Sequence, residues 1–494
     1  MFSGSRISNI LGYLGVVFHI TALMTASPVI ICLLFGEHDY LQSFLVPAVS
    51  VFVLGTILRD RFSPENISRG EAMVASALAW IIIPAVGIFP FVQFFQFETP
   101  ELHPGGEAYM DAYFESVSGY TATGLTMIPD VESAPRAILF FRSATEWFGG
   151  VGVIVLFLAV LLTPGSAAAQ LYTAEGRTDR IVPSITETAR IIWWIYLFYT
   201  AAGAIGLMIA GMPAWDAVNH SMTGIATGGF SVKNASFGYY DNLNAELVCI
   251  PLMLAGAVSF VVHKKLFERN FRFLFGNVEV RALLAVTLLS TLAIAGHHFL
   301  VLYANDSPDL NAEVTIRGRQ ALFQTASAVS GTGFGTADLS SWTDFSKWIL
   351  TILMVIGGGY GSTSSAIKLI RFVIIFKAVI WIVRKLFLPS RAILPFRVGD
   401  KVFEEQEIMS ASLYAFLYLV FLFGGALAFM SLGYNGTDSF FEVASAQGNV
   451  GLSVGISGPQ LEPIGKVVLI LEMLVGRLEI LPFIALAGFM FGKR

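Results

Sequence analysis

FESVSGYTATGLT, at residues 114–126, sets a bare glycine among small and hydroxyl-bearing residues beside strongly apolar parts of the chain. Three further stretches resemble it: MTGIATGGFS at 222–231, ASAVSGTGFG at 326–335 and FEVASAQGNVGLS at 441–453. Aligned on Gly124, Gly228, Gly333 and Gly451, the stretches stand 104, 105 and 118 residues apart. One such stretch would be weak evidence in an apolar chain, but four at near-constant spacing predict an internal repeat.

The composition of the chain defines its broad class. Of the 494 residues, 55% are hydrophobic and 13% are charged, and the charged share is about half that of an average soluble protein. A soluble fold could not bury so much apolar surface. The chain is therefore expected to be an integral membrane protein.

Ten apolar runs are long enough to cross a bilayer, which takes roughly 20 residues per helix. An even number of spans places both termini on one side of the membrane. The first run is too long for a cleavable signal sequence and is followed by the second after a short turn, so it is expected to form a helical hairpin with it. Eight runs are free of interruption: 7–36, 40–58, 72–97, 147–174, 191–215, 247–263, 282–305 and 408–437. The other two, 346–384 and 465–492, are apolar but interrupted.

The distribution of positive charge indicates the orientation, because cytoplasmic loops carry an excess of Lys and Arg. With both termini in the cytoplasm, the inner segments hold 22 of the 30 Lys and Arg residues and the outer segments hold six. The outer loops carry acidic residues, which would concentrate cations at the entrance, although each could simply be a solvated surface charge. These residues are Glu98, Glu101, Glu107, Asp130, Glu132, Asp306, Asp309, Asp338 and Asp344.

Each glycine stretch lies between two apolar spans and follows a short amphipathic segment. This order predicts a unit of helix, short re-entrant helix, glycine turn and helix. An apolar residue stands ten positions before each aligned glycine, at Phe114, Val218, Phe323 and Phe441, and Glu115 and Glu442 follow in the first and last copies. The expected fold is an all-α integral membrane protein with four tandem helix–pore-helix–helix repeats around one central pore, after an N-terminal two-helix hairpin. The expected bounds are 1–69 for the hairpin and 70–175, 176–275, 276–400 and 401–494 for the repeats.

Glycine turns at membrane depth have a chemical use. Irregular backbone is tolerated there where its carbonyl groups line a watery path, and a ring of carbonyl oxygens can replace the hydration shell of a cation. Glycines that merely allow close helix packing would explain one or two positions but not a fourfold register. The expected ion-binding residues are Ala122, Thr123, Gly124, Ala226, Thr227, Gly228, Gly331, Thr332, Gly333, Asn449, Val450 and Gly451.

Four linked units with single-glycine turns resemble the Trk/Ktr/HKT superfamily of cation transporters. EWFGGVGVI at 146–154, GGGYGSTSSAIKLIR at 357–371 and EMLVGRLEILP at 472–482 are similar to further motifs of that superfamily. The two extra N-terminal spans point to its TrkH/TrkG branch of bacterial potassium uptake proteins. The resemblance covers nearly the whole chain. One departure is Ser330-Gly331-Thr332-Gly333, where this branch more often has a run of threonines, and the extra glycine would loosen that turn.

This resemblance implies several properties of the chain. They are potassium as the transported ion, a location in the cell inner (plasma) membrane, a homodimer and a cytoplasmic ring of nucleotide-binding regulatory subunits of the TrkA type. Glycine at all four aligned positions suggests potassium, since members with serine at the first tend toward sodium. Basic residues at the inner surface could also bind membrane lipid. No nucleic-acid partner is expected.

The segment 357–368, GGGYGSTSSAIK, interrupts an expected helix. Glycine costs about 1 kcal/mol per residue in a helix interior, so this segment is expected to be unwound below the glycine turns. In the resembling family such a loop obstructs the ion path and moves on activation, whereas a plain glycine hinge is the alternative. The expected gating residues are Gly357, Gly358, Gly359, Gly361 and Lys368, together with Arg477.

Arg477 lies within the last apolar run, where a charged side chain costs about 2.5–3.5 kcal/mol and is by default functional or paired. Glu472 and Glu479 are not its helical neighbours, so a partner from another repeat or a place facing the pore is expected. The resemblance implies a positive charge that acts as a barrier to ions. Arg142 and Glu146, four residues apart, are expected to form a structural salt bridge.

Other chemistry is sparse. The seven histidines show no metal-ligand spacing, and neither a phosphate-binding loop nor a catalytic triad is recognisable, so neither an enzyme nor a bound cofactor is expected. Two kinds of transport protein remain open. One is a cation-conducting protein with a filter, and the other is a secondary transporter with alternating access. A sodium-coupled or sodium-permeable cation carrier of the resembling superfamily is a further alternative. Repeats that all run in the same direction favour the first, because alternating-access carriers commonly have inverted repeats.

Overall fold

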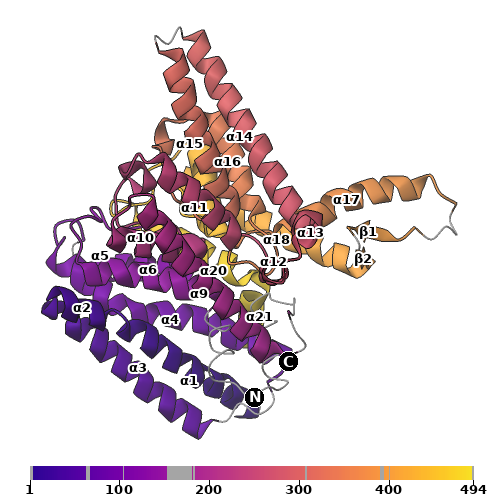
Figure 1. Ribbon diagram of the computed structural model, residues 1–494. Coiled ribbons are helices and arrows are strands. Elements are labelled where there is room, and N and C mark those ends of the chain that lie inside the picture. Colours follow the sequence, from indigo (N-terminus) through magenta and orange to yellow (C-terminus); the bar gives the residue numbers. More distant parts are fainter. Residues whose placement is uncertain are drawn as a thin grey trace.

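The computed structural model describes residues 4–62, 67–103, 105–152, 181, 184–305, 309–389, 394–399 and 401–491. These residues are mostly helical (Figure 1). The strands described are β1 (Phe396–Val398) and β2 (Lys401–Phe403), which pair antiparallel with Phe396 opposite Phe403. The expected helical membrane fold is confirmed at this level.

The N-terminal hairpin consists of α1 (Gly4–Ala26), α2 (Val29–Phe35) and α3 (Leu41–Arg61), with a short 3-10 turn at His38–Tyr40. Pro28 lies between α1 and α2, where proline cannot supply a helical N–H group. Helices α1 and α3 approach closely where each has a glycine. A Cβ atom on Gly15 or Gly55 would lie only 2.8 Å from an atom of the other helix. The hairpin therefore packs through small residues.

A common order of helices surrounds each glycine stretch. A long apolar helix comes first, a helix that ends at the glycine stretch follows, and an outgoing helix comes after it. We call α5, α10, α15 and α19 the turn helices. The sets are α4 (Arg69–Phe97), α5 (Glu107–Tyr120) and α6 (Arg136–Val151); α9 (Ile185–Ile209), α10 (Ala214–Ile225) and α11 (Leu243–Gly256); α14 (Val278–Ala304), α15 (Leu310–Ser330) and α16 (Asp344–Ile356); and α18 (Glu405–Ser431), α19 (Gly436–Gly448) and α20 (Pro463–Leu478).

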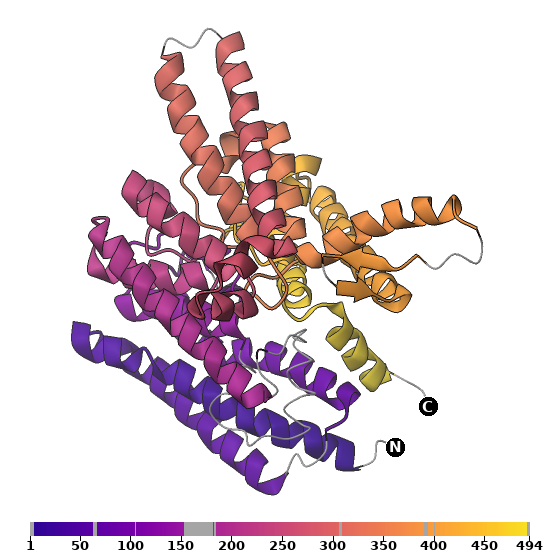
Figure 2. The same ribbon diagram turned by 45° about the vertical axis from the view of Figure 1, so that its right-hand side comes forward.

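The remaining helices connect or extend these sets. They are α12 (Phe260–Phe267), α13 (Phe271–Gly276), α17 (Leu369–Leu386) and α21 (Ile480–Phe491), with 3-10 turns at Ser236–Tyr239 and Leu339–Ser341. In both ribbon views α14 and α15 project as a two-helix arm, and α17 projects with the β-hairpin on another side (Figures 1 and 2). The start of α1 and the end of α21 lie at the same end of the molecule.

Six of the described helices are long and apolar enough to cross a membrane. They correspond to the predicted runs that begin at residues 7, 40, 72, 191, 282 and 408. The predicted run 247–263 is instead two helices, α11 and α12, bent by 113°. Runs 346–384 and 465–492 are each divided into two helices, and residues 153–174 of run 147–174 lie outside the described residues.

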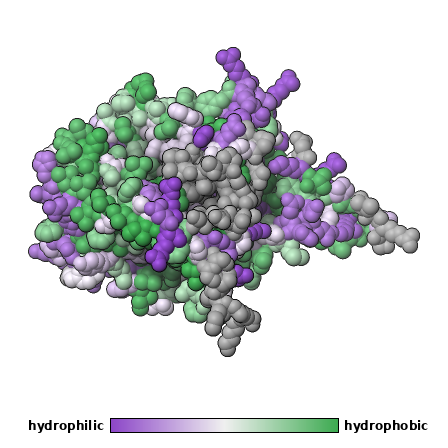
Figure 3. All heavy atoms as spheres, turned by 90° about the horizontal axis from the view of Figure 1, so that it is seen from below, coloured by the Kyte–Doolittle hydropathy of each residue, from purple (hydrophilic) through white to green (hydrophobic). Residues whose placement is uncertain are grey.

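The surface agrees with a lipid environment. Hydrophobic side chains cover broad areas of the face seen from below (Figure 3), and large apolar residues such as Ile209, Phe376 and Phe387 are 83%, 65% and 84% exposed. Polar residues near the ends of the turn helices are buried instead, among them Ser118, Thr223, Ser327 and Ser445. This arrangement is the reverse of a soluble protein, in which polar groups are mostly exposed.

Candidate ion-binding site

The four turn helices end in one shared backbone conformation. In each turn a residue with positive φ is followed by a residue of ordinary φ and then by a glycine with positive φ. Residues other than glycine rarely adopt positive φ. The recurrence of this backbone conformation in all four turns therefore indicates a specific shared structure. The pairs are Ala122 and Gly124 (φ 53° and 91°), Thr227 and Gly229 (54° and 89°), Gly331 and Gly333 (77° and 81°), and Asn449 and Gly451 (52° and 93°).

Hydrogen bonds of the same pattern hold each turn. The residue before the last glycine donates its N–H to the carbonyl oxygen five positions earlier, on a serine or threonine of the turn helix. In the first and fourth turns that serine also accepts from the N–H of the last glycine, at 3.1 and 3.0 Å. The backbone bonds are Thr123 to Ser118 (2.8 Å), Gly228 to Thr223, Thr332 to Ser327 and Val450 to Ser445 (each 2.9 Å).

The four turns are neighbours in cyclic order. A Cβ atom on the last glycine of any turn would overlap a backbone carbonyl oxygen of the next turn, so only glycine fits. Gly124 faces the oxygen of Gly228, Gly229 that of Thr332, Gly333 that of Val450, and Gly451 that of Thr123. The contacts close on themselves, so these four carbonyl groups belong to one ring, which we call the carbonyl ring.

The predicted alignment was wrong by one residue in the second turn. Gly229, not Gly228, has the positive φ and the close contact to the next turn. Gly228 supplies the ring carbonyl, and Ala226 lies one position before the shared conformation. Two consecutive glycines allow either alignment in sequence, and the structure selects Gly229, whose positive φ and contact with the Thr332 carbonyl oxygen match those of the other three ring glycines.

A buried polar side chain braces each turn. It stands nine residues before the ring glycine and bonds to the segment just after that glycine. Glu115 accepts from Met127 N–H at 2.8 Å, and Glu442 accepts from Val454 N–H at 3.2 Å. His220 Nε2 lies 2.9 Å from Ser231 Oγ, and the Gln324 amide, oriented to match its neighbours, pairs with Phe334 and Thr336 at 3.2 Å.

Sequence reasoning identified only the two glutamates of this set. With the second turn aligned on Gly228, residue 219 takes the place of His220, and the common position is hidden. Alignment on Gly229 would have brought Glu115, His220, Gln324 and Glu442 into one column. A chemically mixed column of polar residues within apolar helices is the signal that could have found them.

The segment 357–368 is unwound, as predicted. Helix α16 ends at Ile356 and α17 begins at Leu369. Thr363 N–H donates to Gly256 O at 3.1 Å, and Gly359 N–H donates to Ala257 O at 2.7 Å. These bonds satisfy carbonyl groups freed by the bend between α11 and α12, so the two breaks stabilise one another.

The unwound segment touches the turns from one side. The Thr227 hydroxyl donates to Thr363 Oγ1 at 3.1 Å, and Thr363 donates to Gly256 O at 2.8 Å. A Cβ on Gly331 would lie 2.9 Å from Ser364 Oγ. At its end Lys368 donates to the Ser364 carbonyl oxygen, with a positive φ of 76°. The segment is therefore packed against the second and third turns.

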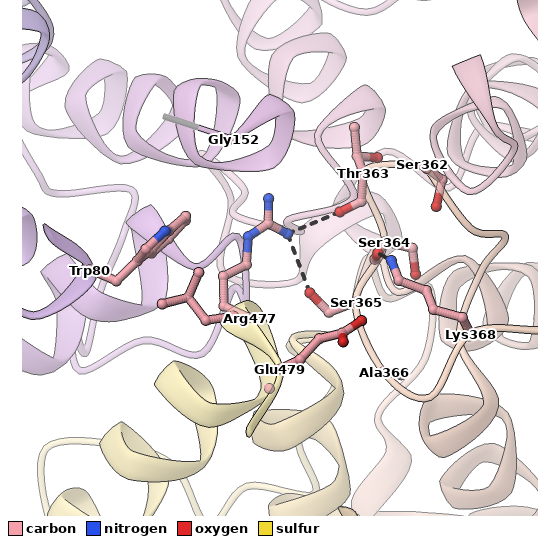
Figure 4. Close-up of a pocket in the computed structure, with 13 residues that line it drawn as sticks. Trp80, Gly152, Ser362, Thr363, Ser364, Ser365, Ala366, Lys368, Arg477 and Glu479 are labelled. Atoms are coloured by element: carbon pink, nitrogen blue, oxygen red, sulfur yellow. Dashed lines mark hydrogen bonds between the residues drawn. The ribbon is translucent and has the colours of Figure 1, made fainter. Parts of the chain in front are cut away.

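Arg477, near the end of α20, joins this segment to α6. Its Nη1 donates to Thr363 O at 3.0 Å and to Ser365 Oγ at 3.3 Å, and its Nη2 donates to Gly150 O at 2.8 Å and to Gly149 O. Figure 4 shows the guanidinium group between Trp80 and the part of the unwound segment that holds Thr363 and Ser365. The cavity there measures about 50 Å³ and is lined on several sides by residues 361–366. As expected, Arg477 finds partners from other parts of the chain.

The predicted salt bridge between Arg142 and Glu146 was wrong. Arg142 Nε pairs with Glu115 Oε1 at 2.7 Å, and Arg142 Nη1 donates to Ser231 O at 2.9 Å. Glu146 accepts from Phe230 N–H at 3.0 and 3.1 Å. Helical spacing allowed the pair, but both side chains find better-placed partners in the turns.

The loops that follow the first and third turns carry stabilised negative charge. Asn234 donates to Asp130 Oδ1 at 2.7 Å, and this hydrogen bond, with further bonds from Glu132 and Ser133, holds the pKa of Asp130 below its usual range. Hydrogen bonds from Ser340 likewise lower the pKa of Asp338. Both carboxylates stay ionised at neutral pH. Among the described residues no group of three or more His, Cys, Asp and Glu side chains could hold a metal ion. The carbonyl ring is the candidate cation site because its four backbone oxygens lie together.

Helices long enough to span a membrane and an ordered ring of backbone oxygens define a membrane-embedded cation transport protein. The comparisons agree. The sequence model of the TrkH family, described as "Cation transport protein", matches residues 94–491. The chain belongs to the TrkH family, which is a family of transporters and not of enzymes.

Similarity to individual relatives extends over almost the whole chain. An uncharacterized cation transporter of Methanocaldococcus jannaschii is 36% identical over 99% of this chain and 96% of its own length. The Trk system potassium uptake protein TrkH of Salmonella typhimurium is 31% identical over 97% of both chains. The crystal structure of the potassium transporter TrkH from Vibrio parahaemolyticus superposes with a TM-score of 0.82 at 28% identity, covering 99% of this chain and 100% of that one.

Proposed function

We propose that this chain conducts potassium ions across the membrane through the carbonyl ring. In this proposal the four sets of helices are repeats of one unit around a single path, with approximate bounds 70–175, 176–275, 276–400 and 401–494 after the hairpin 1–69. The observation that carries it is the cyclic contact of each ring glycine with the next ring carbonyl. A closed ring of carbonyl oxygens offers a desolvated cation a substitute for its water.

Potassium is the proposed ion for two reasons. The relatives from Salmonella typhimurium and Vibrio parahaemolyticus are named for potassium. All four residues that contact the next ring carbonyl are glycines, so no side chain at these positions displaces a ring oxygen. A single layer of such turns provides few stacked sites, so we expect moderate preference over sodium.

We further propose that residues 357–368 form the gate, with Lys368 at one end and Arg477 as its latch. The segment packs beneath the second and third turns, and Arg477 donates both to it and to the end of α6. An unwound stretch can take two arrangements of similar energy more readily than a helix can. A guanidinium group near the path would also repel passing cations.

The same proposal includes the surroundings of the chain. Both termini would lie in the cytoplasm of a cell whose inner membrane holds a homodimer. The basic residues after α17 would face a cytoplasmic nucleotide-binding regulatory subunit, and other basic residues would face lipid headgroups. An open cation path would dissipate the membrane potential, so control by such a partner is required.

The test of the conduction path is ion flux in liposomes with potassium and sodium gradients set independently. Gly124→Ser and Gly229→Ser should each lower the potassium-to-sodium permeability ratio, because a side chain there displaces the neighbouring carbonyl group. Gly296→Ser is the matched control, since a Cβ at that α14 position has open space around it. Unchanged ratios in both ring variants, with normal folding, would exclude the ring as the ion site.

The test of the gate is removal of Gly357 to Gly361. We expect flux that no longer responds to the regulatory partner, because the shortened segment cannot fill its place below the turns. Flux that remains fully regulated after this deletion would show that the segment is not the gate.

A further inference from the structure

We propose that Arg142 and Glu146 of α6 are positioning residues that hold the second turn in the carbonyl ring and thereby determine the cation preference. Both lie one helical turn apart, both are buried, and both bond to the segment after Gly229 rather than to each other. The inference rests on the proposed function of the ring. It adds that one helix of the first unit shapes the ion site of the second.

Glu146 shapes the backbone on both sides of Gly229. Its two carboxylate oxygens accept from the N–H of Phe230 at 3.0 and 3.1 Å. Its carboxyl group also fills the space beside Gly228 that any larger residue would need. Gly228 supplies the ring carbonyl of this turn, so the position of that oxygen follows the position of the Glu146 carboxylate.

Arg142 holds the same segment from the next helical turn of α6. Its Nη1 donates to Ser231 O at 2.9 Å, and its guanidinium carbon lies 3.9 Å from the centre of the Phe230 ring. Its Nε donates to Glu115 at 2.7 Å. Glu115 in turn accepts from Met127 N–H after the first ring glycine. The Arg142 guanidinium group therefore connects the segments that follow two neighbouring ring glycines, Gly124 and Gly229.

This charged pair of residues is specific to α6. At the same distance from the other three ring glycines, the place of Glu146 is taken by Pro251, Val355 and Met473, and the place of Arg142 by Leu247, Thr351 and Leu469. Buried charges seldom add net stability over apolar residues of similar volume. Three units form the same backbone turn without these charges, so the turn itself does not require them. The position of the second ring carbonyl is what they specify.

The experiment measures the permeability ratio of potassium to sodium in liposomes, with thermal unfolding of the purified protein in parallel. The variants are Arg142→Lys, Arg142→Met and Glu146→Gln, and Gly124→Ser reports on the ring itself. Lys347→Met is the matched control, because Lys347 is equally buried and ion-paired, with Asp438 at 2.8 Å, but lies outside the segments after the ring glycines. Glu146→Gln preserves shape, which keeps the test valid where a larger change prevents folding.

We expect Arg142→Met and Glu146→Gln to lower the ratio about tenfold, equivalent to about 1.4 kcal/mol, with a partial recovery in Arg142→Lys. Lys347→Met should change thermal stability and leave the ratio near that of the unaltered chain. An unchanged ratio in folded Glu146→Gln and Arg142→Lys, beside a lowered ratio in Gly124→Ser, would overturn this inference alone. An unchanged ratio in Gly124→Ser would overturn the proposed ion site itself.

Discussion

The carbonyl ring and the unwound segment 357–368 both consist of non-helical backbone between helices. They differ in the hydrogen bonds that stabilise them. Each ring turn is closed mainly by hydrogen bonds within its own unit, and this pattern occurs four times. The unwound segment occurs once in the described part of the chain. Besides bonds of its own, it is held by groups from elsewhere, including Gly256, Thr227 and Arg477. A shape with its own bonds is rigid, whereas a shape that depends on distant partners can be released when one of them moves.

This difference agrees with the two roles that we propose, an ion site for the carbonyl ring and a gate for the unwound segment. The ring has to keep four oxygens at constant positions, and steric contact between neighbouring turns leaves no freedom at the glycines. For the proposed gate, the segment would have to be stable in at least one other arrangement, and its bonds to neutral carbonyl groups are individually modest, about 0.5–1.5 kcal/mol each. Variants that remove either a contact within the ring or a hydrogen bond from a distant segment can therefore test the comparison.

The largest effect is expected at a ring glycine. Gly333→Ala should lower the free energy of unfolding by more than about 3 kcal/mol or prevent folding, because the added Cβ overlaps the Val450 carbonyl oxygen. Gly455→Ala, with the same type of φ but open space around the residue, should cost only about 1–2 kcal/mol. Thermal unfolding in detergent measures both. Equal losses would mean that backbone strain, not the neighbouring turn, demands glycine in the ring.

The next effect separates the two arginines near the unwound segment. Arg371 pairs with Glu479 at 2.7 and 2.9 Å, so Arg371→Met should leave that carboxylate unpaired and cost about 3–5 kcal/mol. Arg477→Met leaves behind the neutral carbonyl groups of Gly149, Gly150 and Thr363. It should therefore destabilise less and raise cation flux in the absence of a regulatory partner.

Flux and thermal unfolding measured on the same preparations decide this second comparison. Low flux together with a large loss of stability in Arg477→Met would assign that residue a structural role. The proposed latch requires higher flux from a protein that remains folded.

A smaller effect is expected at Thr363, where the unwound segment meets the second turn. Thr363→Val removes a hydroxyl that bonds to Thr227 and Gly256, which should shift the gate toward its open arrangement by about 1–2 kcal/mol. Ser362→Ala is the control, since the Ser362 hydroxyl bonds to Gly359 within the segment. Flux without the partner should rise in Thr363→Val and not in Ser362→Ala. A rise of the same size in both would show that the bonds between segment and turn are not what holds the gate.

The smallest effect concerns the first positive-φ position of each turn. Ala122→Gly should stabilise by about 0.5–1 kcal/mol, because glycine adopts φ near 53° without the strain that alanine has there. Gly331→Ala should destabilise by about 1 kcal/mol for the same reason, with Ser364 able to rotate away. Chemical denaturation of the two variants measures both signs. A loss of stability in Ala122→Gly would show that the four turns are not equally strained.

Much of the ring could be predicted from sequence because its requirements are local. Glycine with positive φ and a hydroxyl side chain five or six positions earlier leave a pattern that repeats along the chain. The third turn shows this well. Its extra glycine, Gly331, was expected to loosen the turn but takes the conformation that Ala122, Thr227 and Asn449 adopt with positive φ. The unwinding of 357–368 was likewise predicted, since several glycines in succession weaken any helix.

Other features could not be predicted because they depend on which segments meet. The choice between Gly228 and Gly229 is visible only in the contact of Gly229 with the Thr332 carbonyl oxygen, which belongs to another turn. The expected pairing of Arg142 with Glu146 was plausible on one helix and was replaced by bonds to two different turns. Helical spacing states which side chains could meet, but not which other groups compete for them.

Sequence reasoning alone was enough to predict a helical membrane protein with four similar glycine turns, an unwound segment at 357–368 and an arginine within the last apolar run. Composition, periodicity and glycine content act on each segment separately, so they can be read without knowing the neighbours. The three-dimensional contacts were needed to show that the turns close into a ring, that Gly229 completes it, and that Arg477 joins Thr363 to Gly150. Those facts arise from contacts between distant segments, where steric fit and hydrogen-bond geometry select one partner among several that the sequence allows.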